Sequence, residues 1–380
     1  MDFDFSPEQK EIQHQAARLL AEQCDLRAVR RVLEGEAPYD RALWKQVAEL
    51  GWLGVAMPEE CGGLGPGHGT LCVIAEELGR ALAPLPVSSS IYLAAEAILQ
   101  AGDAQQRSEL LPMLASGERI ATLAAAEGLR SASATEQMLA RVDAGRLSGT
   151  KLPVPDGMVA DWAVVSARTA SNADEPDAEC TGLFLVELDG PGVQRDALQC
   201  LDPTRPQARI VFDAAPARLL GPAEGGAAAL RRVLDRAAVL IAFEQIGGAD
   251  AALAMSTEYA KIRHAFGRPI GSFQAIKHKL ADMYTRNQLA RSNAWYAAWA
   301  LDASPDELPL AAAAARVAAS EAFEFAAKET IQTHGGIGAT WEGDMHLYYR
   351  RAKALMLGLD SPPHWRQRLV RALEDRLVAS

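Results

Sequence analysis

The chain has 380 residues, more than one packed core usually holds, so we expect several domains. Hydrophobic residues make up 49% and charged residues 23%, which is typical of folded globular proteins and argues against disorder. The 38 lysines and arginines and the 49 aspartates and glutamates leave a net charge of −11 at pH 7, which argues against binding to nucleic acid.

The first 118 residues are predicted to be helical. Ser6 lies three residues before Gln9, with Pro7 between them, and this pattern is typical of a helix start. The spacing of apolar residues predicts further helices over residues 41–50, 71–82 and 91–101. Prolines and glycines crowd residues 57–69 and predict a loop there.

A β-rich segment is predicted from about residue 120. Three runs rich in branched and aromatic residues, bounded by turn residues, predict strands over residues 160–168, 181–190 and 208–214. The polar residues 169–180 are predicted to form a loop. Because the intervals lack helices long enough for crossovers, we expect an antiparallel domain.

Long helices are predicted again from about residue 227. Apolar spacing indicates helices over residues 231–266, 273–299 and 310–333. The last of these is rich in alanine, which lets neighbouring helices approach closely. A helical bundle is the simplest arrangement for these segments.

Several common functional motifs are missing from the sequence. It contains no dinucleotide-binding glycine pattern after a strand, no Walker motif and no nucleophile elbow. The five cysteines and seven histidines show no zinc-ligand spacing, so no metal site is expected. No apolar run reaches the length that spans a bilayer, and the first residues differ from a secretory signal, so we expect a cytoplasmic protein without a membrane span.

Two islands of polar residues and glycines interrupt the C-terminal helices, at residues 259–274 and 332–353. In the first, Tyr259 and Arg263 are four residues apart and share one helix face. Taken alone, this island is a corner between two helices with surface charges. In the second, the glycines either end a helix in a tight turn or let backbone N–H groups approach a phosphate or an adenine ring.

These islands, in this order and spacing, resemble the acyl-CoA dehydrogenase family. Three more segments match the family in order: MPEECGGLG at residues 57–65, GRLSGTK at 145–151 and LLGPAEGG at 219–226. The resemblance extends over most of the chain, and the strings at residues 259–274 and 332–338 are its most specific parts.

The resemblance implies an α+β fold with FAD between its barrel and its bundle. The implied domains are an N-terminal helical domain at residues 1–118, a middle β-barrel at 119–224 and a C-terminal four-helix bundle at 225–380. The implied activity is the FAD-dependent α,β-dehydrogenation of an acyl-CoA thioester, an oxidoreductase reaction of fatty acid or steroid catabolism. The implied partners are an electron-transfer flavoprotein as electron acceptor and further chains of the same fold, in a homo- or hetero-oligomeric dimer or tetramer.

In the family, the first island and the glycine loop of the second reach the FAD of a neighbouring subunit. The matching cofactor-binding positions here are Arg263, Phe266, Gln274, Gln332, Gly335 and Gly336. The residue types suit this role, because a guanidinium can bind a pyrophosphate through two hydrogen bonds and a glycine pair admits close backbone contact.

The carboxylate that removes the α-proton in the family has no direct counterpart here. Leu359 stands at its usual place, and Ala237 stands at the alternative place on the preceding long helix. Asp360, one residue further along, and Glu244, about two helical turns beyond Ala237, are the candidate substitutes. For both, the alternative is a structural carboxylate at a turn or in an ion pair.

The middle domain also departs from the family pattern. The family's flavin-binding T-E-P-x-x-G-S-D segment is AEGLRSAS at residues 126–133 here, so Ser131 and Ser133 are the candidate replacements. After Lys151 the family usually presents a hydroxyl to the flavin, whereas this chain has Pro153 and Pro155, which have no N–H to donate.

Three functions are consistent with these residues. The first is an FAD-dependent acyl-CoA dehydrogenase, or one subunit of a heteromeric enzyme that acts on bulky thioesters such as steroid fragments. The second is a catalytically silent scaffold that completes the FAD site of an active paralogue. The third is a flavin oxidase or hydroxylase of the same fold, which needs no α-carbon base.

Overall fold

The structure is a computed structural model that describes residues 5–133, 135, 138–169, 181–222 and 224–379. It divides into two compact units, each of which combines segments distant in the sequence. The helical unit comprises residues 1–30, 68–83 and 238–380, and the sheet unit comprises residues 31–67 and 84–237. The predicted domain boundaries at residues 118 and 224 divide the chain along its sequence and stay a prediction.

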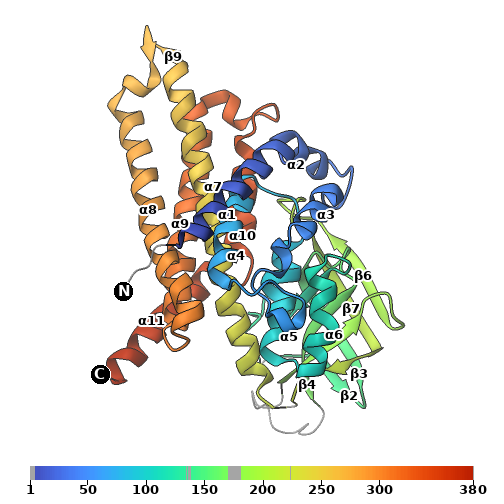
Figure 1. Ribbon diagram of the computed structural model, residues 1–380. Helices are drawn as coiled ribbons and strands as arrows, with labels where there is room; N and C mark the ends of the chain where they lie inside the picture. Colours follow the sequence, from blue (N-terminus) through green and yellow to red (C-terminus); the bar gives the residue numbers. More distant parts are fainter. Residues whose placement is uncertain (1–4, 134, 136–137, 170–180, 223, 380) are drawn as a thin grey trace. The chain divides into compact units, whose positions relative to one another are not determined.

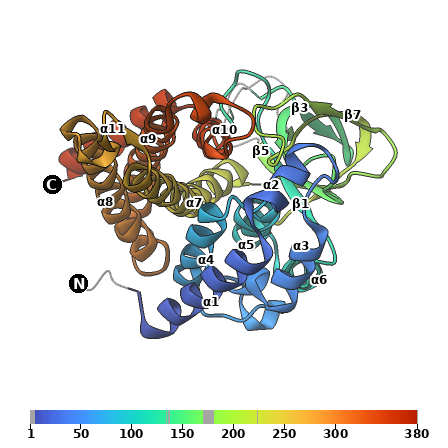
Figure 2. The same ribbon diagram turned by 90° about the horizontal axis from the view of Figure 1, so that it is seen from above.

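Long helices form the helical unit, and several of them run alongside one another (Figures 1 and 2). Its elements are α1 Pro7–Gln23, α4 His68–Arg80, α7 Gly226–Ile262 from residue 238 onward, α8 Gln274–Ala303, α9 Leu308–His334, α10 Met345–Leu357 and α11 Pro362–Ala379, with α2 Leu26–Leu33 at the sequence boundary to the sheet unit. Helix α9 packs against α8, α10 and α11. Its alanines are buried along most of its length, as the predicted close helix packing requires.

The predicted helix start at residue 6 is confirmed. Ser6 Oγ accepts a hydrogen bond from the Gln9 N–H at 3.2 Å, and Gln9 Oε1 accepts one from the Ser6 N–H at 2.9 Å. Pro7 occupies the first helical position, where the helix needs no N–H donor. The helices predicted over residues 231–266, 273–299 and 310–333 are observed as α7, α8 and α9.

Helices α4 and α7 cross with their backbones in contact. A Cβ atom at Gly79 would overlap the carbonyl oxygen of Glu244, and a Cβ atom at Gly247 would overlap that of Glu76. Only glycine permits this approach, because every other residue type would push the two helices apart.

The predicted absence of a membrane span stays a prediction. Among the residues with a described structure, α7 is long and apolar enough to cross a membrane by length and composition alone. Its apolar stretch is 72% buried inside the protein, and a core helix of a soluble protein passes the same test. The sequence reading missed the stretch because isolated charges interrupt its apolar residues.

The described residues of the sheet unit form short helices and eight strands in one sheet. Its helical elements are α3 Arg41–Glu49, η1 Trp52–Gly54, η2 Glu59–Cys61, the π-helix η3 Ser88–Ala95, α5 Glu96–Ala101 and α6 Ala104–Ala115. Its strands are β1 Ala121–Ala124, β2 Arg141–Asp143, β3 Arg146–Pro155, β4 Trp162–Thr169, β5 Thr181–Glu187, β6 Val193–Leu198, β7 Gln207–Pro216 and β8 Arg218–Leu219. The strand order is β6-β7-β3-β2-β4-β5-β8, and β1 pairs with β4.

The predicted strands are observed as β4, β5 and β7, but the sheet is mixed rather than wholly antiparallel. Strands β1 and β2 each pair with β4 in parallel. The crossover from β1 to β4 contains strands β2 and β3 in place of a helix, so the absence of long helices did not exclude parallel pairing. The loop predicted at residues 169–180 lies almost wholly outside the described residues.

Candidate functional site

The first island forms a small hairpin at the end of α7. The strands β9 His264–Ala265 and β10 Arg268–Pro269 pair antiparallel, and the turn between them contains Phe266, with φ 53°, and Gly267. Phe266 is 95% exposed. Arg263 is also exposed, and its side chain forms no hydrogen bond or ion pair within the described part of the chain. The hairpin therefore presents an arginine that an external anion can bind.

The second island begins with a glycine turn at the end of α9, η8 Gly335–Ala339. Gly335 has φ 63°, a conformation that favours glycine. Gly336 has no such conformation, and a Cβ atom there would meet nothing within 4 Å. Because nothing inside the described structure requires glycine at position 336, the open backbone suits close approach by an external group.

A stacked pair of rings joins the two islands. The rings of Tyr259 in α7 and His334 in α9 lie 4.1 Å apart at an angle of 24°. Burial lowers the pKa of His334, and its Nδ1 lies 2.8 Å from the carbonyl oxygen of Thr330. The structure thus brings together the ends of α7 and α9, which carry Arg263 and Gly336.

Two more predicted cofactor residues lie beside these ends. Gln274 is the first residue of α8 and is exposed. It directly follows Phe273, whose ring lies 6.1 Å from that of Phe266. Gln332, in the last turn of α9, is exposed as well.

Asp360 lies in the turn between α10 and α11. Leu359 and Asp360 both have positive φ, 56° and 75°. The Asp360 side chain is only 8% exposed, and its Oδ2 lies 3.6 Å from His364 Nε2. Its charge also acts on the buried guanidinium of Arg316. Asp360 therefore interacts with two cationic or titratable groups.

Arg316 is buried in α9 and reaches this same turn. Its guanidinium donates to Gln245 Oε1 at 2.7 Å, to Ser320 Oγ at 2.9 Å and to the carbonyl oxygens of Leu355 and Gly358. Burial lowers the pKa of Arg316 to about 9, against the opposing effect of Asp360. Arg316 thus caps the end of α10, a role that no motif in the sequence predicts.

The other base candidate lies in the core. Glu244 is fully buried in α7, where its backbone touches Gly79 of α4. Ala237, at the family's alternative base position, is buried and belongs to the sheet unit. The burial of Glu244 and Ala237 does not show which residue acts as the base.

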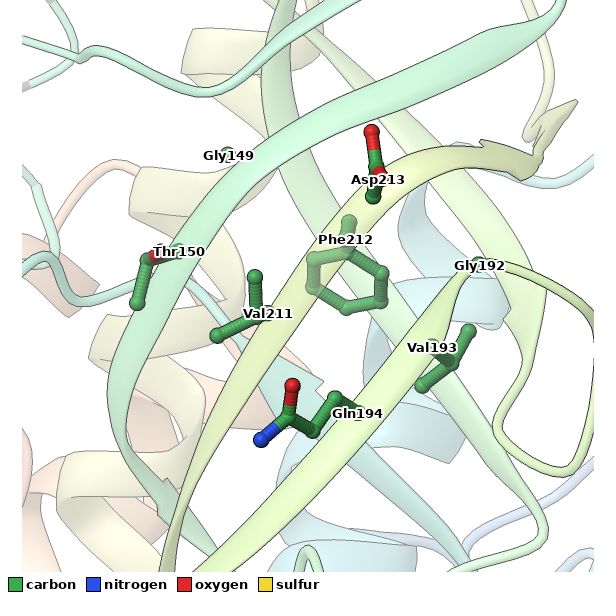
Figure 3. Close-up of a pocket in the computed structure, with 8 residues that line it drawn as sticks. All are labelled: Gly149, Thr150, Gly192, Val193, Gln194, Val211, Phe212 and Asp213. Carbon is green, nitrogen blue, oxygen red and sulfur yellow. The ribbon is translucent and has the colours of Figure 1, made fainter.

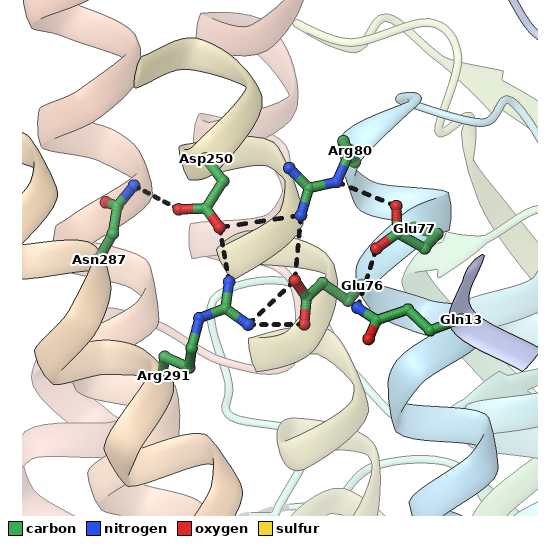
Figure 4. Close-up of polar contacts among 7 residues, drawn as sticks. All are labelled: Gln13, Glu76, Glu77, Arg80, Asp250, Asn287 and Arg291. Carbon is green, nitrogen blue, oxygen red and sulfur yellow. Dashed lines mark hydrogen bonds and ion pairs between the residues drawn. The ribbon is translucent and has the colours of Figure 1, made fainter. Parts of the chain in front are cut away.

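A network of ion pairs fills the space between α1, α4, α7 and α8 (Figure 4). Glu76 accepts two hydrogen bonds from Arg291, at 2.9 and 3.0 Å, and Arg291 also binds Asp250 at 2.5 Å. Arg80 bonds to Glu76 and Glu77. Burial raises the pKa of Glu76, although Arg291 and Arg80 oppose this effect. No sequence pattern predicts this network, because Glu76 and Arg291 are 215 residues apart.

In the sheet unit, the candidate flavin-binding residues Ser131 and Ser133 lie together, with their hydroxyl oxygens 2.9 Å apart. They follow Glu127, which forms a buried ion pair with Lys151 Nζ at 2.8 Å. Pro153 is exposed on β3, and Pro155 is half-buried.

A shallow hollow of about 580 Å³ lies on the sheet unit (Figure 3). Thr150, Val211 and Gln194 stand side by side on three adjacent strands, and Asp213 and Phe212 extend the lining. None of the predicted site residues lines this hollow. The candidate site therefore consists of the hairpin after α7 and the glycine turn after α9, and it does not include this hollow.

Comparison with known proteins identifies the class of this fold and site. Family models of the acyl-CoA dehydrogenase N-terminal and C-terminal domains match residues 6–118 and 224–358. The chain is 34% identical over 376 residues to the acyl-CoA dehydrogenase IpdE2 of Mycobacterium tuberculosis, covering 98% of this chain and 99% of that one. These matches define a flavin-dependent oxidoreductase of acyl thioesters.

Solved structures share the fold over almost the whole chain. The Tcur3481-Tcur3483 steroid acyl-CoA dehydrogenase is 36% identical with a TM-score of 0.87, covering 98% of this chain and 99% of that one. The ChsE4-ChsE5 complex of Mycobacterium tuberculosis and a structure of the electron transferring flavoprotein of Acidaminococcus fermentans are each 28% identical, with TM-scores of 0.88 and 0.89 and the same coverage. The chain belongs to the acyl-CoA dehydrogenase family, and the predicted fold is confirmed.

FAD is the cofactor of this family, and the ends of α7 and α9 fit it. Arg263 offers an uncommitted guanidinium for a pyrophosphate, and Gly336 leaves room for backbone contact. The chain is therefore an FAD-dependent acyl-CoA dehydrogenase or a subunit of one.

Proposed function

We propose that this chain is one subunit of a heteromeric acyl-CoA dehydrogenase and completes the FAD site of a partner chain of the same fold. The observation that carries this proposal is an asymmetry within the chain. Arg263 and Gly336 stand open toward an external group, whereas Leu359 and Ala237 occupy the two usual positions of the base. The proton of the acyl α-carbon would then be removed by a carboxylate of the partner.

Within this assembly, each part of the chain has a distinct task. FAD, when bound, supplies the acceptor for the hydride that leaves the β-carbon. Arg263 binds the pyrophosphate of that cofactor through its fork of N–H donors, and Gly336 lets the backbone approach it. The stack of Tyr259 on His334 holds the two loops together, because it links the ends of the helices that carry them.

The solved relatives support a heteromer with a bulky substrate. Two of them, the Tcur3481-Tcur3483 steroid enzyme and the ChsE4-ChsE5 complex, combine two differently named chains. We propose a steroid-derived or similarly bulky acyl-CoA as substrate. The match to the structure of an electron transferring flavoprotein supports such a protein as the electron acceptor. We propose that the assembly works in the cytoplasm.

Flavin content tests this proposal. The chain is purified alone and together with a carboxylate-bearing partner, and the flavin per chain is measured from the visible spectrum. We expect a nearly colourless chain alone and a yellow complex. In the complex, Arg263→Ala should weaken FAD binding by about tenfold or more, because a charge-assisted hydrogen-bond pair is lost. Arg18→Ala, at an exposed arginine of α1, serves as the control. An Arg263→Ala complex with normal FAD affinity would refute the proposal.

A second candidate function gives the chain its own base, Asp360. The observation behind it is the position of this carboxylate in the α10–α11 turn, next to Leu359 and shielded from solvent. Burial next to the Arg316 guanidinium keeps a carboxylate close to a counter-charge and away from water. Substitution of Asp360, described in the Discussion, separates the two candidates.

A further inference from the structure

A histidine and a tryptophan are stacked where the chain passes from the glycine turn into α10. The rings of Trp341 and His346 lie 4.9 Å apart at an angle of 17°. Trp341 is 50% exposed, and His346, in the first turn of α10, is half-buried. Both ring nitrogens of His346 are shielded from solvent, yet they form no hydrogen bond of normal geometry within the described residues. The imidazole is therefore held by packing against Trp341 rather than by hydrogen bonds.

Two arginines lie beside the same indole ring. The guanidinium carbons of Arg30 in α2 and Arg350 in α10 are each 5.7 Å from the centre of the Trp341 ring. Burial lowers the pKa of His346 from its ordinary value of 6.5, and the charges of Arg30 and Arg350 lower it further. The backbone of Trp341 and the charge of Asp344 act in the opposite direction without reversing the shift of this pKa. At neutral pH the ring that stacks on Trp341 is therefore the uncharged imidazole.

The backbone of this loop is fastened at several points. Arg30 donates to the carbonyl oxygens of Trp341 and Gly343, at 2.8 and 3.0 Å. Its Nε also donates to Asp344 Oδ1 at 2.8 Å. A Cβ atom at Gly343 would lie 2.5 Å from the carbonyl oxygen of Ile337, so the loop packs closely on the glycine turn η8. A movement of Trp341 therefore reaches the glycine turn.

Protonation of His346 changes the balance of charge in this loop. It adds a third positive charge beside the two guanidinium groups, while Asp344 already accepts a hydrogen bond from Arg30 and Glu342 is exposed to solvent. An opened loop lets the imidazole reach water, where it binds a proton more readily than in the stack. Opening therefore takes up a proton, and each pH unit below about 6.5 favours it by at most about tenfold.

We propose that His346 and Trp341 form a pH-sensitive latch, which holds residues 340–344 against the glycine turn at neutral pH and releases them in acid, so that FAD is then bound less tightly. The consequence for FAD rests on the proposed function, because it requires the glycine turn to contact the cofactor. The latch itself rests on the stack, the two arginines and the close packing of Gly343 on the turn.

The accessibility of Trp341 tests the latch. Quenching of tryptophan fluorescence by acrylamide is measured for the complex with the partner chain between about pH 8 and pH 5.5, and the signal of Trp341 is the difference between the wild type and Trp341→Phe. On acidification we expect this quenching to increase by about twofold or more in the wild type, and to stay constant in His346→Phe, whose ring stacks but binds no proton. His364→Phe is the matched control, because the His364 ring meets Trp365 edge-on at 6.2 Å, and it should respond as the wild type does.

Three outcomes would overturn the latch. The first is quenching of Trp341 that does not change with pH in the wild type. The second is a loss of emission in acid at unchanged accessibility, which would show that the charged imidazole stays on the ring. The third comes from Arg350→Gln, which serves also if His346→Phe does not fold. Removing one of the two repelling charges should weaken the response to acid, so an unchanged response would contradict the latch.

The affinity for FAD tests the consequence of the latch. The dissociation constant of FAD from the complex is measured at about pH 7.5 and pH 5.5. We expect acid to raise it by about threefold more in the wild type than in His346→Phe, because only the closed fraction of the loop binds FAD well. An equal rise in the two proteins would overturn the link between the latch and FAD. Failure of the proposed function is seen separately, as normal FAD affinity at neutral pH after Arg263→Ala.

Discussion

The helical unit contains two kinds of arginine, in its interior and at the ends of its helices. In the interior, Arg291 and Arg316 are surrounded by carboxylates, an amide and carbonyl oxygens of the same chain. At the end of α7, Arg263 is exposed and has no such partner within the described residues. A buried cation must be satisfied internally, because its desolvation is costly, whereas an exposed one remains available for an external anion. The comparison separates residues that hold the fold from those that meet another molecule.

The largest effect is expected from breaking the interior network. Glu76→Ala removes both hydrogen bonds that Arg291 donates to Glu76 and leaves its guanidinium with Asp250, so the free energy of unfolding should fall by about 3 kcal/mol, because two hydrogen bonds between charged groups in the interior are lost. Denaturant unfolding measures the loss. Glu258→Ala removes an exposed pair with Lys261 and should cost about 0.5 kcal/mol or less. Equal losses in the two variants would contradict the distinction.

Lys151 is a buried cation of the sheet unit, like Arg316 in the helical unit. Its altered pKa makes the free energy of unfolding depend on pH. Burial lowers the pKa of Lys151 from 10.5 to about 8, and Glu127 offsets only part of this effect. Between about pH 8 and 10.5 the unfolded chain therefore holds a proton that the folded chain has released, so the free energy of unfolding rises with pH. The unfavourable contribution of Lys151 is largest below this window and fades across it.

The variant Lys151→Met removes this titration. The stability of the wild type relative to Lys151→Met should rise by about 1–3 kcal/mol across the window. Urea unfolding of both proteins below, within and above the window measures the difference. In the wild type, Lys151 and the backbone N–H groups lower the pKa of Glu127 although burial opposes them, so Glu127 does not titrate within this range. A difference that is independent of pH would show that Lys151 keeps its ordinary pKa.

Gly336 tests the second class, the residues that we propose to meet another molecule. A methyl group at this position meets nothing in the described structure, so Gly336→Ala should change the free energy of unfolding by less than about 0.5 kcal/mol. The same methyl group would keep the backbone away from the cofactor, and FAD binding to the complex should weaken by about tenfold. Flavin titration and thermal unfolding of one preparation report both values. Unchanged FAD affinity would show that the turn does not contact the cofactor.

The smallest effect is expected at Asp360. This carboxylate interacts with Arg316 and His364 and belongs to the interior class, so Asp360→Asn should lower the kcat of the complex by less than about threefold if the partner carries the base. Steady-state kinetics with an acyl-CoA measure the change. A loss of about a hundredfold or more would instead assign the base to this chain.

Local sequence patterns predicted the elements whose signals lie within a few residues. The capping pattern at Ser6 and the apolar spacing of α7, α8 and α9 needed no knowledge of distant partners. The resemblance gave the family and its cofactor for a related reason, because the hairpin and glycine-turn residues are contiguous strings. Helices α10 and α11 were not predicted separately, and the parallel pairing of β1 and β2 was missed because these strands have only 4 and 3 residues.

The sequence by itself determined the succession of helical, β-rich and helical segments, the family and FAD as the cofactor, and it predicted the loops that we propose to bind this cofactor. Only the tertiary structure decided which charges meet: Glu76 with Arg291, 215 residues apart, and Glu127 with Lys151, 24 residues apart. Periodicity specifies which face of an element is apolar, but which faces then pack together depends on the close approach of helices such as α4 and α7. A charge becomes a structural partner or an open binding group only through that packing, since burial determines the cost of leaving it unpaired.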